Sequence, residues 1–205
     1  MYDPSTIEVL EGLEPIRRRP EMYVGDRGQA GLNMLIAELV GNAAAEVTEG
    51  HATRVEVSLS GDTVAVGDDG RGSPVKVHER YGVSPLEVVF TTLFACGCGC
   101  EHEPGHRTGE VSVGLSVVNA LSAWLKVETT RDGRLYRLGF EKGQVSHPLE
   151  EVGETERRGT RVTFAPDRTI FDAEACLDTP WLEQHLRELP LGEGSIVLRR
   201  DENTV

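Results

Sequence analysis

One long amphipathic segment, residues 29–49, restricts the fold more than any other part of this sequence. Its apolar residues recur at spacings of three and four, which predicts a helix whose apolar face packs on a core. Glu38, Asn42 and Glu46 stand four residues apart, so they share a second face of the same helix. We therefore expect a line of polar side chains along the border of the core.

Length and composition predict one soluble α/β domain over residues 1–205. A chain of 205 residues buries one substantial core, and 39% hydrophobic with 27% charged residues is ordinary for a soluble protein. The sequence has no apolar run of about eighteen residues and does not begin like a signal peptide, which favours the cytoplasm and argues against a membrane partner. A net charge of −13 repels phosphate backbones, so any DNA contact is expected through other domains.

Helical patterns are more frequent early in the chain and strand patterns later. The pairs Gly61-Asp62 and Asp132-Gly133 each separate two strand-like segments, as in hairpins. The expected helices are residues 5–13, 29–49, 84–94, 111–122 and 180–188. The expected strands are residues 54–59, 63–66, 126–130, 134–138, 160–164 and 195–199. This order predicts an α/β fold of the α+β kind, with helices forming one layer on a mixed, largely antiparallel sheet.

Three consecutive arginines follow the first expected helix. Arg17, Arg18 and Arg19 lead to Pro20 and Gly25, a combination that predicts a basic turn. Two interpretations remain open at this point, because such a turn is either a solvated loop or a strap that anchors the N-terminal segment to the domain.

The segment from Asp68 to Pro74, Asp-Asp-Gly-Arg-Gly-Ser-Pro, directly follows an expected strand. Its two carboxylates and two glycines lie where the backbone turns tightly and can approach a flat ligand. A carboxylate at a strand end can accept a hydrogen bond from an exocyclic amine such as that of adenine, so Asp68 and Gly70 are candidate nucleotide-binding residues. Acidic residues and glycines also fill plain hairpin turns, which is the alternative interpretation.

Two further features fit a nucleotide with a metal ion. Glu38 offers a general base, and Asn42 offers a neutral oxygen of the kind that binds magnesium. Gly109 and Gly114 lie around the start of the helix expected from about residue 111, and free N–H groups at a helix N-terminus attract phosphate. The alternatives are a solvated helix face and an ordinary loop boundary.

Soft metal ligands gather in the irregular segment between residues 95 and 110. A zinc site is one interpretation, although the Cys-x-Cys-x-Cys spacing differs from the usual pair of cysteines two residues apart. An irregular loop without metal is the other. The candidate zinc ligands are Cys96, Cys98, Cys100, His102 and His106.

Several segments, taken in order along the chain, resemble the DNA gyrase B family of the GHKL ATPase superfamily. Beyond the Glu38, Asn42 and Glu46 helix, these segments are Ile7–Glu14, Arg17–Gly25, Asp68–Pro74, Ser116–Ser122 and Gly153–Thr160. The resemblance covers almost the whole chain, and together these segments are highly specific. It implies a Bergerat-type fold that binds ATP with magnesium, an N-terminal arm over residues 1–20 and an ATP lid over about residues 95–112. It also implies that the family's transducer domain is absent from this chain.

The resemblance implies roles for single residues. Glu38 matches the general base that activates the attacking water, and Asn42 matches the magnesium ligand. Asp68 matches the adenine-binding carboxylate, with Thr160 beside it. The other matches are Glu46, Arg71, Pro74, the arm residue Tyr2 and Arg137, a rim residue near which inhibitors of the family bind. Gly70 and Gly114 complete the set of candidate nucleotide-binding residues. In the family, ATP closes a homodimer through the arm and drives DNA strand passage with a gyrase A-type subunit, so we expect those partners here.

The chain departs from the family at positions near the triphosphate. Gly41 and Ala45 replace two acidic residues around Asn42, and the lid segments Cys96–Gly99 and Gly109–Ser112 lack the family's lysine and its His-Gly contact. The lid changes remove groups that stabilise triphosphate charge. Two functions therefore remain. One is the ATP-hydrolysing domain of an ATP-dependent type II DNA topoisomerase that drives dimer-gate closure, and the other is a catalytically weakened, nucleotide-responsive regulatory module.

Overall fold

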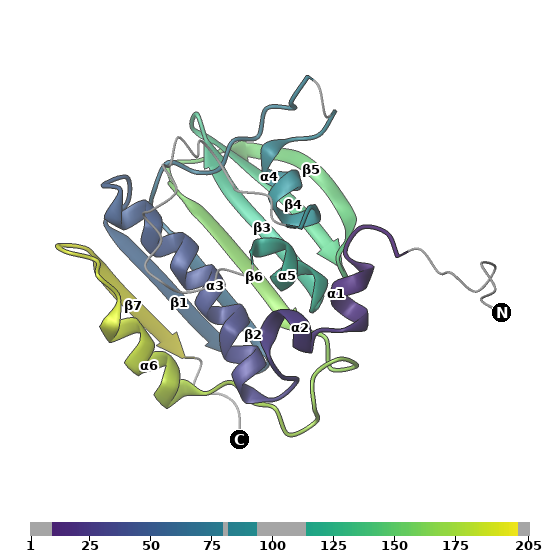
Figure 1. Ribbon diagram of the computed structural model, residues 1–205. Coiled ribbons are helices and arrows are strands. Elements are labelled where there is room, and N and C mark those ends of the chain that lie inside the picture. Colours follow the sequence, from purple (N-terminus) through teal and green to yellow (C-terminus); the bar gives the residue numbers. More distant parts are fainter. Residues whose placement is uncertain (1–9, 80–81, 94–113, 201–205) are drawn as a thin grey trace.

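The strands that the structure describes form one sheet, in which their order differs from their order in the sequence (Figure 1). The computed structural model describes residues 10–79, 82–93 and 114–200. The strands of that part are β1 (Arg54–Ser60), β2 (Thr63–Asp68), β3 (Ser122–Arg131), β4 (Arg134–Glu141), β5 (Gln144–Glu154), β6 (Thr160–Pro166) and β7 (Ser195–Arg200). They pair in the order β5-β4-β3-β6-β2-β1-β7. Within the described residues β1 and β7 are parallel and the other neighbours antiparallel, which confirms the mixed, largely antiparallel sheet.

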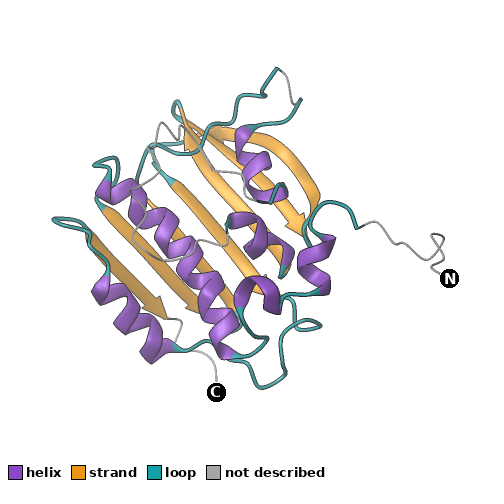
Figure 2. Cartoon of the chain, viewed as in Figure 1, coloured by secondary structure: helices purple, strands orange, loops and turns teal. Residues whose placement is uncertain are grey.

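The helices lie on one face of this sheet, so the predicted two-layer architecture is confirmed (Figure 2). In the described part they are α1 (Glu14–Arg18), α2 (Glu21–Val24), α3 (Gln29–Thr48), α4 (Pro85–Thr91), α5 (Leu115–Ala120) and α6 (Thr179–Glu188). The longest, α3, packs on β1 and β2, and α4 and α5 pack on each other. The end of β2 therefore lies beside α3 and between two neighbouring strands of the sheet.

The core lies between α3 and the sheet, as the apolar periodicity predicts. The apolar face of α3 is buried from Leu32 to Val47. It meets the inward residues of β1, which alternate between buried and more exposed positions as in a half-buried strand. Central β2 is buried at four consecutive positions, because it lies between β1 and β6. This packing fixes the polar face of α3, with Glu38, Asn42 and Glu46, at the border of the core.

Two local features differ from the sequence predictions, and a third prediction falls mostly outside the described residues. Strand β5 was not predicted, because its residues are mostly exposed and carry no buried apolar alternation. The helix expected over 111–122 is shorter, since α5 starts at Leu115 and β3 begins at Ser122. Most of the helix expected over 5–13 lies outside the described residues. Pro15 stands in the first turn of α1, where its missing N–H is tolerated.

Arg17 anchors the N-terminal helices to the body of the domain. Its guanidinium donates hydrogen bonds to Oδ2 of Asp167 and to the carbonyl of Ala120, both at 2.6 Å. Burial pushes the pKa of Asp167 upward, but hydrogen bonds from Arg17 and Thr169 outweigh it and hold that pKa below its ordinary value. At Arg17, the basic segment therefore acts as an anchoring strap and not as a solvated loop.

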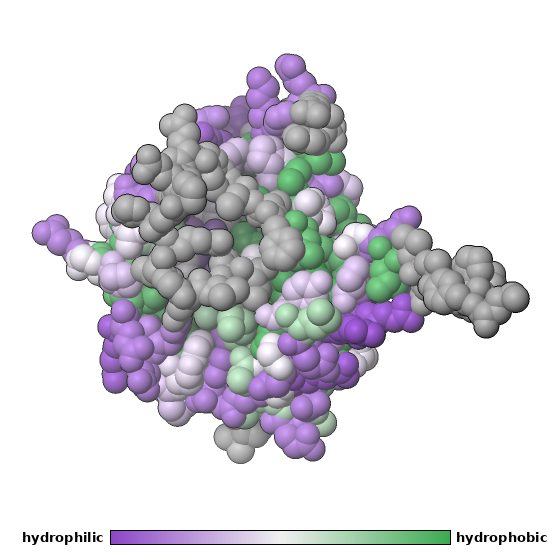
Figure 3. Space-filling model, in the orientation of Figure 1, coloured by the Kyte–Doolittle hydropathy of each residue, from purple (hydrophilic) through white to green (hydrophobic). Residues whose placement is uncertain are grey.

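The surface of the helical layer is mixed in character. In the described part, no helix combines the length and the apolar character needed to cross a membrane. Figure 3 shows hydrophilic residues around most of this face and hydrophobic residues reaching the surface around α4 and α5.

Candidate functional site

Asp68 is a partly buried carboxylate at the end of β2, where the chain enters a turn over residues 69–74, called here the glycine turn. Its Oδ1 accepts hydrogen bonds from the backbone N–H groups of Gly70 (2.8 Å) and Thr160 (3.3 Å). Within the described residues, Oδ2 accepts no hydrogen bond. Polar atoms in such a setting ordinarily have partners, so Oδ2 can receive an N–H from a ligand.

The surroundings of Asp68 oppose its ionisation. Burial raises the pKa of this carboxyl to about 6, and the nearby carboxylates of Glu46 and Asp69 push it in the same direction. The N–H groups of Gly70 and Thr160 work against this rise but do not cancel it. Asp68 is therefore ionised at neutral pH but takes up a proton at a higher pH than an exposed aspartate, because its pKa is raised.

Neighbouring Asp69 has the opposite environment and a different role. Its carboxylate accepts hydrogen bonds from the N–H (2.7 Å) and hydroxyl (2.6 Å) of Thr53 and from the N–H of Arg54 (2.9 Å). Burial pushes the pKa of Asp69 upward, but these hydrogen bonds outweigh it and hold the pKa below its ordinary value. Asp69 therefore fixes the start of β1, and Asp68 alone of the pair keeps an oxygen for a ligand.

The glycine turn approaches its neighbours too closely for side chains. A Cβ at Gly72, whose φ is +72°, would lie 1.8 Å from the carbonyl oxygen of Thr130, and one at Gly70 would lie 2.7 Å from Glu46 Oε2. At Gly159, with φ +92°, a Cβ would lie 1.9 Å from the carbonyl oxygen of Asp68. The glycines therefore let three chain segments meet around the Asp68 carboxylate.

Three hydroxyl groups lie next to Asp68, and two of them were not predicted. Thr129 and Thr160, from β3 and β6, face each other with their Oγ1 atoms 2.9 Å apart. Ser73 of the glycine turn donates its N–H to Thr129 Oγ1 (2.8 Å), and its own Oγ lies 3.3 Å from Thr160 Oγ1. Thr160 was expected in the site, whereas Ser73 and Thr129 carry no distinctive sequence signal.

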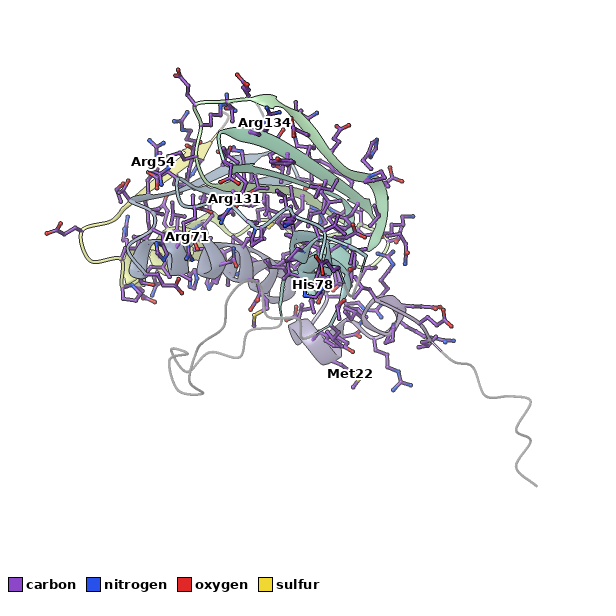
Figure 4. All side chains as sticks on the ribbon, turned by 90° about the horizontal axis from the view of Figure 1, so that it is seen from above. Met22, Arg54, Arg71, His78, Arg131 and Arg134 are labelled. Atoms are coloured by element: carbon purple, nitrogen blue, oxygen red, sulfur yellow. The ribbon has the colours of Figure 1, made fainter. Side chains whose placement is uncertain are left out.

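Charged side chains border the glycine turn. Arg71 contacts Glu46 at 2.7 Å, the pairing that the resemblance implies. Arg131 donates to the carbonyls of Gly72 (3.2 Å) and Arg71 (3.4 Å), and Figure 4 shows Arg71 and Arg131 at the same end of the molecule. Sequence reasoning missed Arg131. Arg137, the residue expected at the rim, forms an ion pair with Glu128 (3.0 Å).

The polar face of α3 reaches from the glycine turn toward α5. Glu38 is half-buried, and its Oε2 accepts the N–H of Gly114 at 2.8 Å. Gly114 precedes α5, so this N–H, expected to be available for phosphate, is engaged by a carboxylate in this structure. Asn42 lies one turn further along α3 and is exposed. Pro74 ends the glycine turn, and its carbonyl accepts the N–H of Leu86 at 3.3 Å.

Several predicted site residues lie outside the described residues. These are Tyr2, Cys96, Cys98, Cys100, His102 and His106. In the part of the chain that the structure describes, no group of three or more His, Cys, Asp or Glu residues could hold a metal ion.

Two surface hollows of the described part lie away from Asp68. One of about 490 Å³ lies between α6 and β7 and is lined mainly by apolar residues such as Leu186 and Leu198. Another borders the β3–β4 turn near Asp132. Burial raises the pKa of the Asp68 carboxyl to about 6, and this perturbed acid favours the end of β2 over either hollow as the functional site.

Comparison with known proteins points to ATPases. The family model described as "Histidine kinase-, DNA gyrase B-, and HSP90-like ATPase" matches residues 28–170. The chain is 46% identical to the B-type subunit of DNA gyrase from Thermotoga maritima over 92% of its own length and 30% of that protein. It is 41% identical to the B-type subunit of DNA topoisomerase 4 from Staphylococcus aureus over 91% of its length and 28% of that protein. The chain thus spans less than a third of these relatives.

A solved structure agrees with the sequence matches. The 43K ATPase domain of Thermus thermophilus gyrase B, in complex with an aminocoumarin, superposes with a TM-score of 0.81 at 36% identity, covering 94% of this chain and 50% of that one. This similarity confirms the expected gyrase B-type ATPase fold. Because the family model also matches more than half of the residues, the chain belongs to the histidine kinase-, DNA gyrase B- and HSP90-like ATPase family.

Proposed function

We propose that residues 1–205 form the single ATP-binding and ATP-hydrolysing domain of a DNA gyrase B-like type II topoisomerase. The observation that carries this proposal is the Asp68 carboxylate, which keeps one oxygen without a hydrogen bond from the described residues beside a turn that excludes side chains. The ATPase family supports ATP as the ligand, and the relatives named as gyrase and topoisomerase 4 proteins support the wider activity.

Asp68 is the residue that recognises the base. The 6-amino group of adenine donates hydrogen bonds and an ionised carboxylate accepts them, so Oδ2 of Asp68 is a matching partner. Gly70 and Thr160 already hold Oδ1, so the carboxylate is positioned before the ligand arrives. Such preorganisation reduces the entropy lost on binding.

The polar face of α3 serves the phosphates. Asn42 is exposed and offers an amide oxygen to Mg²⁺, whose charge would offset that of the triphosphate. Glu38, one turn earlier, takes the proton of the attacking water as general base. The N–H of Gly114 orients the Glu38 carboxylate at 2.8 Å. The Glu46–Arg71 pair closes the α3 side of the glycine turn.

The same proposal extends to assembly. ATP binding closes a homodimer through the arm at residues 1–20, which includes Tyr2, and hydrolysis reopens it during DNA strand passage in the cytoplasm. A net charge of −13 supports DNA contact through other domains and a gyrase A-type subunit rather than through this chain.

A second candidate function is a nucleotide-responsive regulatory module without efficient turnover. Gly41 and Ala45 support it, because both are exposed on α3 near Asn42 and neither can hold a metal ion or a water through a carboxylate. The two functions share the Asp68 site and differ in the rate of hydrolysis.

Calorimetric titration with a non-hydrolysable ATP analogue and Mg²⁺ tests the proposal. Asp68→Asn keeps an oxygen for the N–H groups of Gly70 and Thr160 but replaces the free acceptor with an NH₂ donor, which cannot bind an amine. We expect this variant to lose most of its affinity. Asp132→Asn, in the β3–β4 turn, is the matched control and should bind like the wild type, because asparagine tolerates its φ of +53°.

Two results would contradict the proposal. Unchanged affinity in Asp68→Asn would show that the adenine base does not bind at the end of β2. A wild-type protein that binds no adenine nucleotide would show that the domain has no ATP site. Steady-state phosphate release then separates the two functions, since the regulatory module binds the nucleotide without turning it over.

A further inference from the structure

The three hydroxyl groups next to Asp68 form a connected hydrogen-bonded cluster, called here the hydroxyl cluster. It consists of Ser73, Thr129 and Thr160, which come from three separate segments of the chain. Thr129 is fully buried, whereas Ser73 and Thr160 are partly exposed. The cluster therefore has an inner end at Thr129 and an outer side that a ligand can reach.

Burial decides the direction of the hydrogen bond from Thr129. Its oxygen already accepts the N–H of Ser73, and within the described residues Thr160 Oγ1 is the one acceptor near its hydroxyl hydrogen. A buried hydroxyl hydrogen without a partner is unfavourable by the free energy of a lost hydrogen bond. Thr129 therefore donates to Thr160.

This direction leaves a donor on the outer side of the cluster. Because Thr160 accepts from Thr129, its own hydrogen is directed onward, either to Ser73 Oγ at 3.3 Å or to a ligand. If Ser73 receives that hydrogen, the hydroxyl of Ser73 points outward in its place. Each of the three hydroxyls carries one hydrogen, and the two hydrogen bonds within the cluster use two of these hydrogens. The third is available to a ligand, and it belongs to Thr160 or Ser73 because Thr129 is buried.

We propose that Thr129 is a positioning residue for base selection, because it orients the hydroxyl cluster so that a donor lies beside the Asp68 acceptor. The inference rests on the proposed ATP site and adds the residue that sets its preference for adenine. Thr129 does not touch the base and acts through Thr160 and Ser73.

Adenine and guanine differ in the order of their hydrogen-bonding groups. Adenine carries an amine donor at position 6 beside an acceptor nitrogen, whereas guanine carries an oxygen acceptor at position 6 beside an N–H donor. For a base held in one orientation by its sugar and phosphates, the acceptor of Asp68 and the donor of the hydroxyl cluster match adenine. Guanine would place its oxygen against the Asp68 carboxylate and its N–H against the donor.

Titrations of paired ATP and GTP analogues, both non-hydrolysable, test this role. Thr129→Val keeps the shape of the side chain and removes the hydroxyl that fixes the direction. We expect the preference for ATP over GTP to fall about tenfold, the effect of one net hydrogen bond. Thr129→Ser restores the hydroxyl and should restore the preference.

Thr130→Val is the matched control for the substitution. Thr130 is the next residue of β3, also buried, and points to the other face of the sheet. The Thr130→Val variant should therefore keep the wild-type preference for ATP over GTP. Thermal unfolding of each variant separates a change in preference from a loss of fold. Thr129→Ala, which also removes the hydroxyl, carries the same test if Thr129→Val does not fold.

The outcomes distinguish a failure of the positioning role of Thr129 from a failure of the proposed ATP site. An unchanged preference in Thr129→Val, or equal losses of affinity for both analogues, would overturn the positioning role, since a purely structural residue affects both bases alike. A wild-type protein that binds both analogues equally would also overturn it while leaving the nucleotide site intact. A wild-type protein that binds neither would instead refute the proposed function.

Discussion

Replacing Asp68 with asparagine is expected to stabilise the fold at neutral pH while it removes most of the affinity for the nucleotide. The amide oxygen can still accept the N–H groups of Gly70 and Thr160, which bind one oxygen of the aspartate. The amide nitrogen would occupy the place of Oδ2, which accepts no hydrogen bond from the described residues. The substitution thus removes the charge and its repulsion by Glu46 and Asp69 and retains the native contacts.

The size of the gain follows from the pKa of Asp68. Folding raises this pKa from an ordinary value of 3.8 to about 6, and at about 1.4 kcal/mol per unit the ionised form costs the fold about 3 kcal/mol above pH 6. Between these two values the folded state binds more protons than the unfolded state, so stability falls as the pH rises. Below pH 3.8 both states are protonated, and the cost disappears.

Urea unfolding of the wild type and of Asp68→Asn at several values between pH 4 and pH 8 measures this difference. The variant should be more stable by up to about 3 kcal/mol at pH 8, with a gain that shrinks below pH 6. Asp69→Asn is the matched control, and it should destabilise the fold because that carboxylate accepts hydrogen bonds from Thr53 and Arg54. A gain that is absent at pH 8, or that does not change with pH, would refute the reasoning.

Three further predictions concern binding, turnover and packing. The affinity for adenosine, which carries no titrating phosphate, should be constant above about pH 6 and fall up to tenfold per pH unit below it as Asp68 becomes protonated. Calorimetry at each pH measures this affinity, and an affinity that does not change with pH would exclude Asp68 as the residue that binds the base. Glu38→Gln should reduce phosphate release roughly 10²–10⁴-fold with nearly unchanged affinity for an ATP analogue, and unaltered turnover would exclude Glu38 as the base. Gly72→Ala should destabilise the fold by about 1–3 kcal/mol more than Gly133→Ala in chemical unfolding, because a Cβ at Gly72 would lie 1.8 Å from a backbone oxygen whereas one at Gly133 meets nothing within 4 Å. Equal effects of the two alanines would contradict that steric argument.

Most of the fold was predictable because its main elements bury regular apolar faces. The spacing of Leu32, Leu35 and Ile36 on α3 reports a single packed face, and that face is buried as expected. The hairpin of β3 and β4 was readable from Asp132-Gly133, and both residues have the positive φ of such a turn. Periodicity and turn chemistry are local signals, so they survive without knowledge of the rest of the chain.

The elements that were missed depend on partners that are distant in sequence. Strand β5 is an edge strand with mostly exposed side chains, and it is held by pairing with β4 rather than by apolar burial. The anchoring of Arg17 depends on Asp167, which is 150 positions away. Neither relation leaves a local pattern, since each exists only after the sheet has formed.

The residues of the site also fall into two groups, those that the sequence predicts and those that only the folded structure shows. Asp68, Glu46 and Arg71 belong to recognisable segments, and the structure brings Glu46 and Arg71 together as expected. Ser73, Thr129 and Arg131 are ordinary residues of a turn and a strand, and only the close approach of the glycine turn to β3 gives them a place in the site. Such residues are found from contacts and not from composition.

The two adjacent aspartates explain why the fold retains a costly carboxylate. Asp69 accepts hydrogen bonds from Thr53 and Arg54, so its charge stabilises β1. Asp68 is ionised at neutral pH against the effect of burial, with one oxygen left unsatisfied by the described residues. A residue that lowers stability and improves no packing is expected where a ligand completes its hydrogen bonds. The unfavourable ionisation of Asp68 in the free protein therefore argues for a ligand with an N–H donor at the end of β2.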